Sequence, residues 1–202
     1  MNARWQVPPN LVQLVDESGQ TVGEADLSDA HTPPGCLHRG FSVFLIDSWA
    51  RLLIQRRSAV RLHSAGLWTS SCCGHPLPGE SPFRSAWRQL GEELGMEALG
   101  LNEVGAVRYK VSVPGMTQAD RMVEYEWHHV FVGMALYAPS PDPLEIAEHS
   151  FVPLDEVNVA LERMGFASWI PASWQVAFPF LSLMTGRSAT PRRSPQRADQ
   201  ES

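Results

Sequence analysis

Short runs of β-branched, aromatic and aliphatic residues recur along the chain and predict β-strands. Clusters of glycine, proline, aspartate and serine separate these runs, as is typical of turns. The predicted strands are Leu11–Val15, Phe41–Ile46 with His38 before it, Arg51–Arg57, Val104–Val113 and Met122–Leu136. We expect the second and third strands to form a hairpin across Asp47–Ala50.

Three other segments have the pattern of helices. Ser81–Met96 opens with serine and proline, which suit a helix cap and first turn. Asp155–Met164 and Ala172–Met184 are also predicted helices, and the second has an apolar side formed by Trp174, Phe178 and Leu181. Because strands and helices do not alternate as regular βαβ units, we predict an α/β (α+β) fold, an α/β/α sandwich around a mixed sheet.

The length of 202 residues fits one domain with a substantial core. We expect this domain to span residues 11–186, after a short irregular N-terminal extension over residues 1–10. Residues 187–202 are rich in arginine, serine, proline and glutamine and lack large apolar side chains, which predicts a disordered tail.

The composition favours a soluble globular enzyme, with 44% hydrophobic and 19% charged residues. A net charge of −6 argues against a nucleic-acid-binding surface. No apolar run approaches the roughly 20 residues of a membrane span, and no segment resembles a signal peptide. Three cysteines, two of them adjacent, argue against a disulfide framework. We expect a cytoplasmic protein, and no obligate protein partner is evident.

The segment Ser71–Glu80 carries a thiol, an imidazole and a carboxylate on what we interpret as a glycine-punctuated loop before a helix. Thiols titrate, imidazoles bind metals, and helix starts bind phosphate groups. The segment therefore indicates a metal-assisted reaction on a small phosphorylated molecule.

The helix after this loop resembles the box of the Nudix superfamily. Glycine at 74 is followed by Glu80, Arg88 and the pair Glu92 and Glu93, while Gln89 stands where the box has a further glutamate. Arg88 and Glu92 are four residues apart and can pair, and the two adjacent glutamates offer oxygens for Mg²⁺ beside a diphosphate. The alternative is a surface helix with ordinary charges.

Three histidines and two glutamates suggest a second metal site. His31, His38 and His75 each lie beside a loop or strand start, and Glu124 and Glu126 share one face of a predicted strand. Like charges on one face repel unless a cation lies between them, and this ligand set suits Mn²⁺, Zn²⁺ or Mg²⁺. We interpret the other histidines as ordinary core or surface residues. They are His63, His128, His129 and His149, of which His128 has the same strand parity as the two glutamates.

Taken together, these motifs resemble the type 1 isopentenyl-diphosphate delta-isomerases. The residues that carry the resemblance are Ala30–Thr32, Leu37–Arg39, Gln55–Arg57, Leu67–Pro76, Glu92–Gly95, Glu124–Glu126 and Trp169. The resemblance implies a divalent metal held by His31, His38, His75, Glu124 and Glu126. It also implies Mg²⁺ on the substrate diphosphate near Glu93 and a reactive cysteine at Cys73.

Isomerisation of isopentenyl diphosphate needs an acid, a base and a dry apolar wall around a tertiary carbocation. The resemblance implies Glu126 as the acid with Tyr109 in contact, and Cys73 as a thiolate that accepts the other proton. Trp169 would face the cation, because indole is the strongest aromatic partner for positive charge. Ordinary packing roles for Trp169 and Tyr109 are the alternatives.

Diphosphate binding is expected from Arg57 and Arg61, while Leu27 and Gln89 occupy positions where the family often has charged residues. Lys110 is a further cation whose side chain the sequence does not locate. An isoprenoid diphosphate is the expected small-molecule substrate. The alternatives are a Nudix hydrolase and a non-catalytic diphosphate-binding module; Cys73 with the five metal-ligand residues favours the isomerase.

Overall fold

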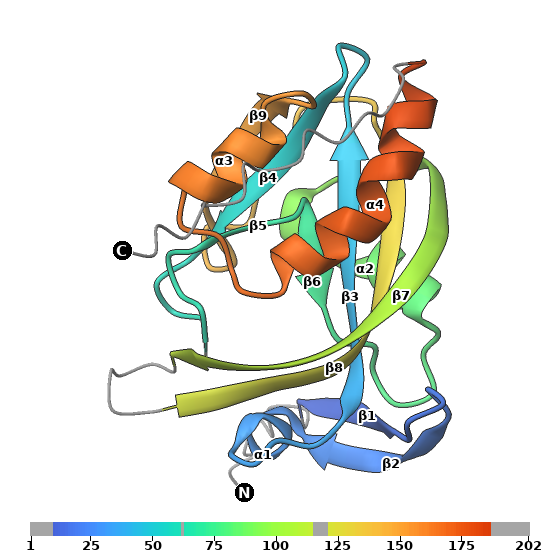
Figure 1. Ribbon diagram of the computed structural model, residues 1–202, viewed down its shortest axis with the longest axis vertical. Coiled ribbons are helices and arrows are strands. Elements are labelled where there is room, and N and C mark those ends of the chain that lie inside the picture. The colour runs from blue at the N-terminus through green and yellow to red at the C-terminus, as the bar shows by residue number, and fades with distance from the viewer. Residues whose placement is uncertain (1–9, 62, 115–120, 187–202) are drawn as a thin grey trace, which may run out of the picture.

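The computed structural model describes residues 10–61, 63–114 and 121–186 (Figure 1). The irregular start predicted for residues 1–10, apart from Asn10, and the tail predicted for residues 187–202 lie outside this part of the chain. The strands are β1 (Leu11–Val15), β2 (Thr21–Asp26), β3 (His38–Ile46), β4 (Arg51–Arg57), β5 (Trp68–Thr69), β6 (Cys72–Gly74), β7 (Ala98–Pro114), β8 (Arg121–Ala135) and β9 (Ile146–Pro153). The helices are α1 (Leu27–His31), α2 (Pro82–Leu94), α3 (Val157–Arg163) and α4 (Ile170–Met184).

Strand β3 is the centre of a mixed sheet. It pairs in parallel with β8, from His38 opposite Glu126 to Ile46 opposite Met134, and antiparallel with β1, β4 and β6. Strand β7 continues the sheet beyond β8, and β9 pairs with β4. Figure 1 shows β1, β2 and α1 lying across one end of β3.

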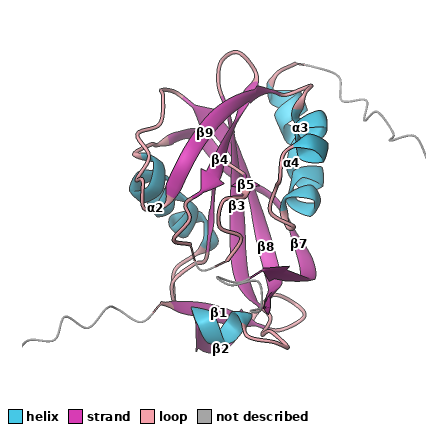
Figure 2. Ribbon diagram, turned by 90° about the vertical axis from the view of Figure 1, so that its left-hand side faces the viewer, coloured by secondary structure: helices cyan, strands magenta, loops and turns pink. Residues whose placement is uncertain are grey.

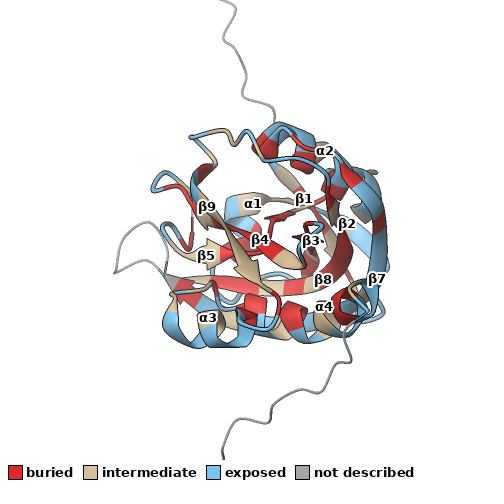
Figure 3. Ribbon diagram, turned by 90° about the horizontal axis from the view of Figure 1, so that it is seen from above, coloured by how far each residue is buried: buried red, intermediate tan, exposed pale blue. Residues whose placement is uncertain are grey.

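Helices cover both faces of the sheet, with α2 on one side and α3 and α4 on the other (Figure 2). Alternating side chains of β3 pack against the helices on opposite faces of the sheet. Phe41, Val43 and Leu45 pack with Leu90 of α2, whereas Phe44 and Ile46 pack with α4. The buried residues follow the strands between the helical layers (Figure 3). The predicted sandwich around a mixed sheet is therefore confirmed.

Local sequence explains the ends of α2. Ser81 caps the helix by accepting a hydrogen bond from the Arg84 amide at 3.3 Å, and Pro82 occupies the first turn. Gly95 ends it in a left-handed conformation with φ of 60°. The helix therefore begins as predicted and ends two residues before Met96.

The apolar side of α4 is largely as predicted. Trp174 and Leu181 are buried, while Phe178 is half-buried against the same cluster. The helix begins at Ile170, two residues before its predicted start, and α3 begins at Val157 rather than Asp155. None of the helices in the described ranges is long and apolar enough to cross a membrane.

Several short elements have no clear signal in the sequence. Cys72–Gly74 forms strand β6 against β3, so its interpretation as a loop is wrong. The strand has three residues, too few for a period to be recognised. The five-residue helix α1 depends on Asp26, whose carboxylate accepts a hydrogen bond from the Ser28 amide at 2.8 Å. Strands β2 and β9 were also missed because they are mostly polar or half-exposed.

Candidate active site

Three histidines from distant parts of the chain come together at one end of β3. His31 ends α1, His38 begins β3 and His75 follows β6. The ring centroids of His31 and His38 are 4.6 Å apart, those of His38 and His75 are 5.0 Å apart, and those of His31 and His75 are 5.4 Å apart. The predicted ligand histidines therefore form a single cluster.

Two carboxylates from β8 face this cluster. Glu124 and Glu126 are two residues apart on the strand and therefore point to the same side, as predicted. Glu124 Oε2 lies 3.2 Å from His31 Nε2, and Glu126 Oε1 lies 3.2 Å from His75 Nε2 and 3.8 Å from His38 Nε2. The parallel pairing of His38 with Glu126 sets this arrangement, because it aligns the first residue of β3 with the carboxylates of β8.

Two further histidines contact the same carboxylates. His128 Nδ1 lies 2.5 Å from Glu126 Oε2, and His63 Nδ1 lies 2.8 Å from Glu124 Oε1. His128 fits its interpretation as an ordinary core residue, because its Nε2 also lies 2.8 Å from Ser42 Oγ, but the sequence did not place either histidine beside these carboxylates. Strand parity with the glutamates was the available signal for His128, whereas His63 lies between β4 and β5 where no periodicity applies.

The remaining histidines lie elsewhere. His129 points to the opposite side of β8, where its Nδ1 lies 2.6 Å from Glu103 and its Nε2 accepts from Arg39 at 2.8 Å. His149 is half-buried on β9.

The buried carboxylates favour their charged forms. Burial opposes ionisation of Glu126, but hydrogen bonds from His128 and then His75 hold its pKa well below the usual value. Burial likewise opposes ionisation of Glu124, and the nearby His63 outweighs it to lower the pKa.

Two of the ligand histidines, His38 and His75, favour the neutral form; burial acts in the same way on His31, but the contact with Glu124 outweighs it and raises the pKa of His31. Burial lowers the pKa of His38, and it lowers the pKa of His75 to about 4. Nδ1 of His31 donates to the Leu27 carbonyl at 2.7 Å, and Nδ1 of His38 donates to the Cys36 carbonyl at 2.8 Å. Because each Nδ1 carries the proton, each Nε2 presents its lone pair to the cluster.

These residues fit a divalent metal ion. His38 Nε2 and Glu124 Oε1 are buried and have no hydrogen-bond partner among the described residues. Buried polar atoms without partners are costly, and several of them converging on one region are typical of a ligand site. Neutral imidazoles and ionised carboxylates are the protonation states that metal binding requires.

Tyr109 of β7 completes the hydrogen bonding of Glu126. Its hydroxyl donates to Glu126 Oε2 at 3.0 Å, because Tyr109 and Glu126 are directly opposed in the antiparallel pair of β7 and β8. Burial raises the pKa of Tyr109 well above its usual value, so it remains a proton donor at neutral pH. The expected contact with the glutamate is present.

The adjacent cysteines point to opposite sides of β6. Cys73 pairs with Ser42 in the sheet and packs with Trp169, whereas Cys72 faces α2, with its Sγ 3.6 Å from Glu93 Oε2. Burial raises the pKa of the Cys73 thiol, although a nearby arginine partly offsets this. The strand alternation therefore selects Cys73, and not Cys72, for the site.

Two side chains donate to the Cys73 sulfur. Arg57 Nη1 lies 3.6 Å from it and Thr69 Oγ1 lies 3.5 Å from it. These donors favour a thiolate, whereas burial favours the thiol.

Trp169 covers the same region. It is 4% exposed, and its indole nitrogen is buried without a hydrogen-bond partner in the described structure. The Arg57 guanidinium lies 5.7 Å from the indole centroid. Cys73, Glu126 and Trp169 line one small cavity of about 20 Å³. Because that volume suits one water-sized occupant, a five-carbon chain requires the walls to move apart.

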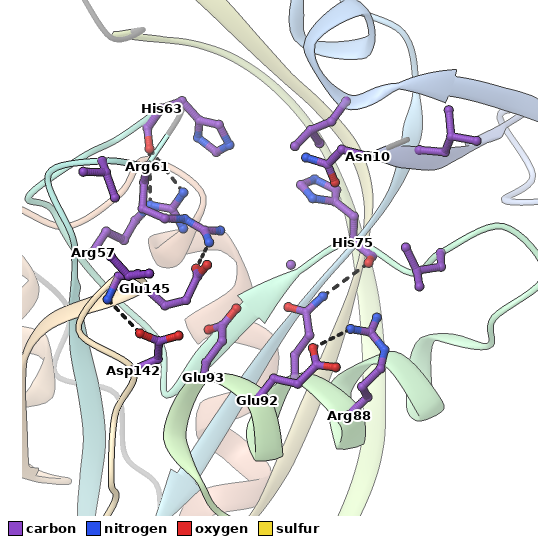
Figure 4. Close-up of a pocket in the computed structure, with 17 residues that line it drawn as sticks. Asn10, Arg57, Arg61, His63, His75, Arg88, Glu92, Glu93, Asp142 and Glu145 are labelled. Atoms are coloured by element: carbon purple, nitrogen blue, oxygen red, sulfur yellow. Dashed lines mark hydrogen bonds and ion pairs between the residues drawn. The ribbon is translucent and has the colours of Figure 1, made fainter. Parts of the chain in front are cut away.

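A larger pocket of about 560 Å³ adjoins this cavity (Figure 4). Arg57 and Arg61, the residues predicted to bind diphosphate, line one side of it and Glu93 lies at its base. Glu93 is buried, and burial raises its pKa despite the two arginines. Leu27 and Gln89 also line the pocket, so the positions without charge belong to this site.

The two glutamates at the end of α2 both line this pocket, but they differ in burial and partners. Glu92 pairs with Arg88 at 2.8 Å (Figure 4) and is exposed, whereas Glu93 is buried. Arg88 also binds Glu80 at 2.8 Å, so Glu80 supports the start of the helix. Lys110 lies over the Tyr125 ring at 4.6 Å, on the side of β7 away from the site.

The NUDIX domain family matches residues 37–172, about two thirds of the chain. The chain therefore belongs to the NUDIX family. Two solved structures share the fold: a protein of Deinococcus radiodurans with a TM-score of 0.65 and 18% identity, and a Nudix hydrolase of M. smegmatis with a TM-score of 0.52 and 19% identity. The first match covers 82% of this chain and 98% of that chain, and the second covers 89% and 98%.

Similar curated proteins carry a more specific name. The isopentenyl-diphosphate Delta-isomerase of Streptomyces griseus is 45% identical over 179 residues, which cover 89% of each chain. That of Nocardia farcinica is 43% identical over 168 residues, covering 82% of this chain and 93% of the relative. Within the NUDIX family, the chain thus belongs to the isopentenyl-diphosphate Delta-isomerases.

Proposed function

We propose that this protein interconverts isopentenyl diphosphate and dimethylallyl diphosphate in isoprenoid biosynthesis, with Cys73 and Glu126 as the two proton-transfer residues. The observation that carries the proposal is the common cavity of Cys73, Glu126 and Trp169, next to the arginine-lined pocket. A hydrolase needs only the pocket and its magnesium carboxylates, whereas an isomerase needs two proton-transfer groups around one carbon chain.

The substrate diphosphate is assigned to the larger pocket. Arg57 and Arg61 supply positive charge, and Glu93 would hold the Mg²⁺ that accompanies the diphosphate. A bridging cation reduces the number of side-chain charges required, which is consistent with uncharged Leu27 and Gln89 in the same pocket.

Burial favours the thiol form of Cys73, and hydrogen bonds from His128 and His75 favour the carboxylate form of Glu126. From this state the Cys73 S–H bond breaks and a C–H bond forms at one alkene carbon, leaving the tertiary cation beside Trp169. Glu126 then removes a proton from the other carbon, and that electron pair forms the new double bond. In this direction Cys73 is the acid and Glu126 the base, the reverse of the roles expected from the sequence. In the reverse reaction Glu126 gives the proton and Cys73 accepts it.

The second divalent ion, Mn²⁺, Zn²⁺ or Mg²⁺, is assigned to His31, His38, His75, Glu124 and Glu126. When bound, it supplies positive charge that keeps Glu126 ionised and fixed in place. Tyr109 fixes the other oxygen of Glu126 by hydrogen bonding. Three free cysteines are consistent with a cytoplasmic location.

The direct test is to incubate the purified protein with isopentenyl diphosphate and Mg²⁺ and to measure both dimethylallyl diphosphate and released phosphate. We expect isomer without phosphate. Phosphate without isomer would instead identify a hydrolase of the same fold.

The ion pair between Arg61 and Glu145 leads to a prediction about substrate affinity. Glu145 occupies Arg61 at the wall of the larger pocket. Glu145→Gln should free Arg61 for the diphosphate and lower KM, whereas Arg57→Ala should raise KM by about 10-fold or more, since a hydrogen bond to a charged group contributes roughly 1.5–3 kcal/mol. Steady-state kinetics with isopentenyl diphosphate measure both.

Arg56→Ala is the matched control, because Arg56 is the neighbouring arginine and pairs with Glu148 at 3.0 Å outside the pocket. Its KM should be unchanged. An unchanged KM in Arg57→Ala would remove Arg57 from the diphosphate site.

A further inference from the structure

His63 lies where the metal-ligand cluster meets the larger pocket. It lines both cavities and is 6% exposed (Figure 4). Its ring stacks on His31 with centroids 4.9 Å apart, and the edge contact with Trp169 has a centroid distance of 5.9 Å. The five ligands assigned above do not include it.

The contact between His63 and Glu124 is not a hydrogen bond. His63 Nδ1 and Glu124 Oε1 are 2.8 Å apart, yet both atoms are buried and neither makes a hydrogen bond within the described structure. At this separation the geometry, and not the distance, prevents the bond. A cation bound by both atoms would satisfy this close approach of two buried ligand atoms.

His63 also satisfies the distances of a metal ligand. The ligand atoms of His31, His63 and Glu124 lie within 4.8 Å of one another, and so do those of His31, His38, His75 and Glu126. His31 belongs to both groups. Its Nδ1 is engaged with the Leu27 carbonyl, so only the Nε2 lone pair remains and can bind a single ion. An ion bound to this nitrogen would join the two groups into one metal centre.

We propose that His63 is a ligand of the same divalent ion. This proposal rests on the proposed metal centre and extends it to six side chains, four of them imidazoles. Six protein ligands leave no position for substrate or water on an octahedral ion, so the ion acts as a closed structural and electrostatic centre. Four imidazoles favour Mn²⁺ or Zn²⁺ over Mg²⁺.

The main chain of His63 connects this centre with the diphosphate pocket. Its carbonyl accepts hydrogen bonds from Arg57 Nε at 3.3 Å and Nη2 at 3.2 Å. Binding of the His63 ring to the ion therefore holds the carbonyl that orients Arg57. Metal loading should slow hydrogen exchange in the segment between β4 and β5, in addition to its effect on the ligands themselves.

The test measures binding of Co²⁺ alone to the full chain. The wild type should bind one tight Co²⁺ and show the weak visible absorption of a six-coordinate ion. His63→Ala should lose at least about 10-fold in affinity, because removing a ligand should cost no less than the 10- to 100-fold typical of changes around the ligands, and it should show a changed spectrum. His149→Ala is the matched control because His149 lies on β9 outside both ligand groups, and it should behave as wild type.

The outcomes separate the two proposals. Equal affinity and an identical spectrum in His63→Ala would overturn the assignment of His63 while leaving the isomerase and its five-ligand centre intact. Two tight Co²⁺ per wild-type chain would overturn the single shared ion. Absence of tight binding in the wild type would overturn the metal centre itself. If His63→Ala does not fold, X-ray absorption of the wild-type Co²⁺ form decides the matter: four coordinated imidazoles support His63 and three exclude it.

Discussion

Cys73→Ala should lower kcat for isomerisation by about 100- to 10,000-fold, the range that one proton-transfer group contributes. The substitution removes a buried thiol that lies in the same cavity as Glu126 and Trp169. The affinity for substrate should change much less, because Arg57 and Arg61 remain. Conversion of isopentenyl diphosphate to dimethylallyl diphosphate, followed over time, measures the loss.

Cys36→Ala is the matched control, because Cys36 is an exposed free cysteine. It should retain wild-type activity. Circular dichroism should show that both variants are folded. Robust isomerisation by Cys73→Ala would show that another residue moves the proton that we assign to Cys73.

Gly40→Ala should lower kcat for isomerisation to a similar extent without replacing any residue that carries chemistry. A Cβ atom at Gly40 would overlap the carboxylate of Glu126. Strand β3 is held by β8 along its whole length, so the carboxylate has to move, and it would lose its contacts with Tyr109 and His75. Overpacking a buried strand should also lower the free energy of unfolding by about 1–3 kcal/mol.

Gly91→Ala controls for the added methyl group. Gly91 lies in α2 with no neighbouring atom within 4 Å of an added Cβ, and alanine is the better helix former by about 1 kcal/mol. This variant should be fully active and at least as stable as wild type. Activity and thermal unfolding of both variants test the comparison, and an active Gly40→Ala would mean that the position of Glu126 is not critical.

The sequence predicted those parts of the site that depend on the spacing of residues within a single strand or helix. Glu124 and Glu126 share a face because they are two residues apart on a long strand. The start of α2 is encoded locally by its cap, Ser81. The histidine cluster also followed from resemblance to a family. For the two glutamates and for the start of α2, the spacing along the chain was itself the evidence.

The remaining parts depend on contacts between distant segments. His63 reaches Glu124 only because the chain after β4 turns back toward β8, and no spacing records that path. The different surroundings of Cys72 and Cys73 depend on pairing of β6 with β3. Glu93 differs from Glu92 because it contacts Cys72 of β6, whereas Glu92 pairs with Arg88 on the same helix.

The parallel pairing of β3 with β8 has a consequence for folding. It joins residues 88 positions apart, such as His38 and Glu126. Long-range parallel pairing forms late and slowly, because the entropy of the intervening chain is lost before the stabilising contacts between the strands form. The ion therefore has no complete site in a partly folded chain. Each tenfold rise in free ion above the dissociation constant should stabilise the native protein by about 1.4 kcal/mol through mass action.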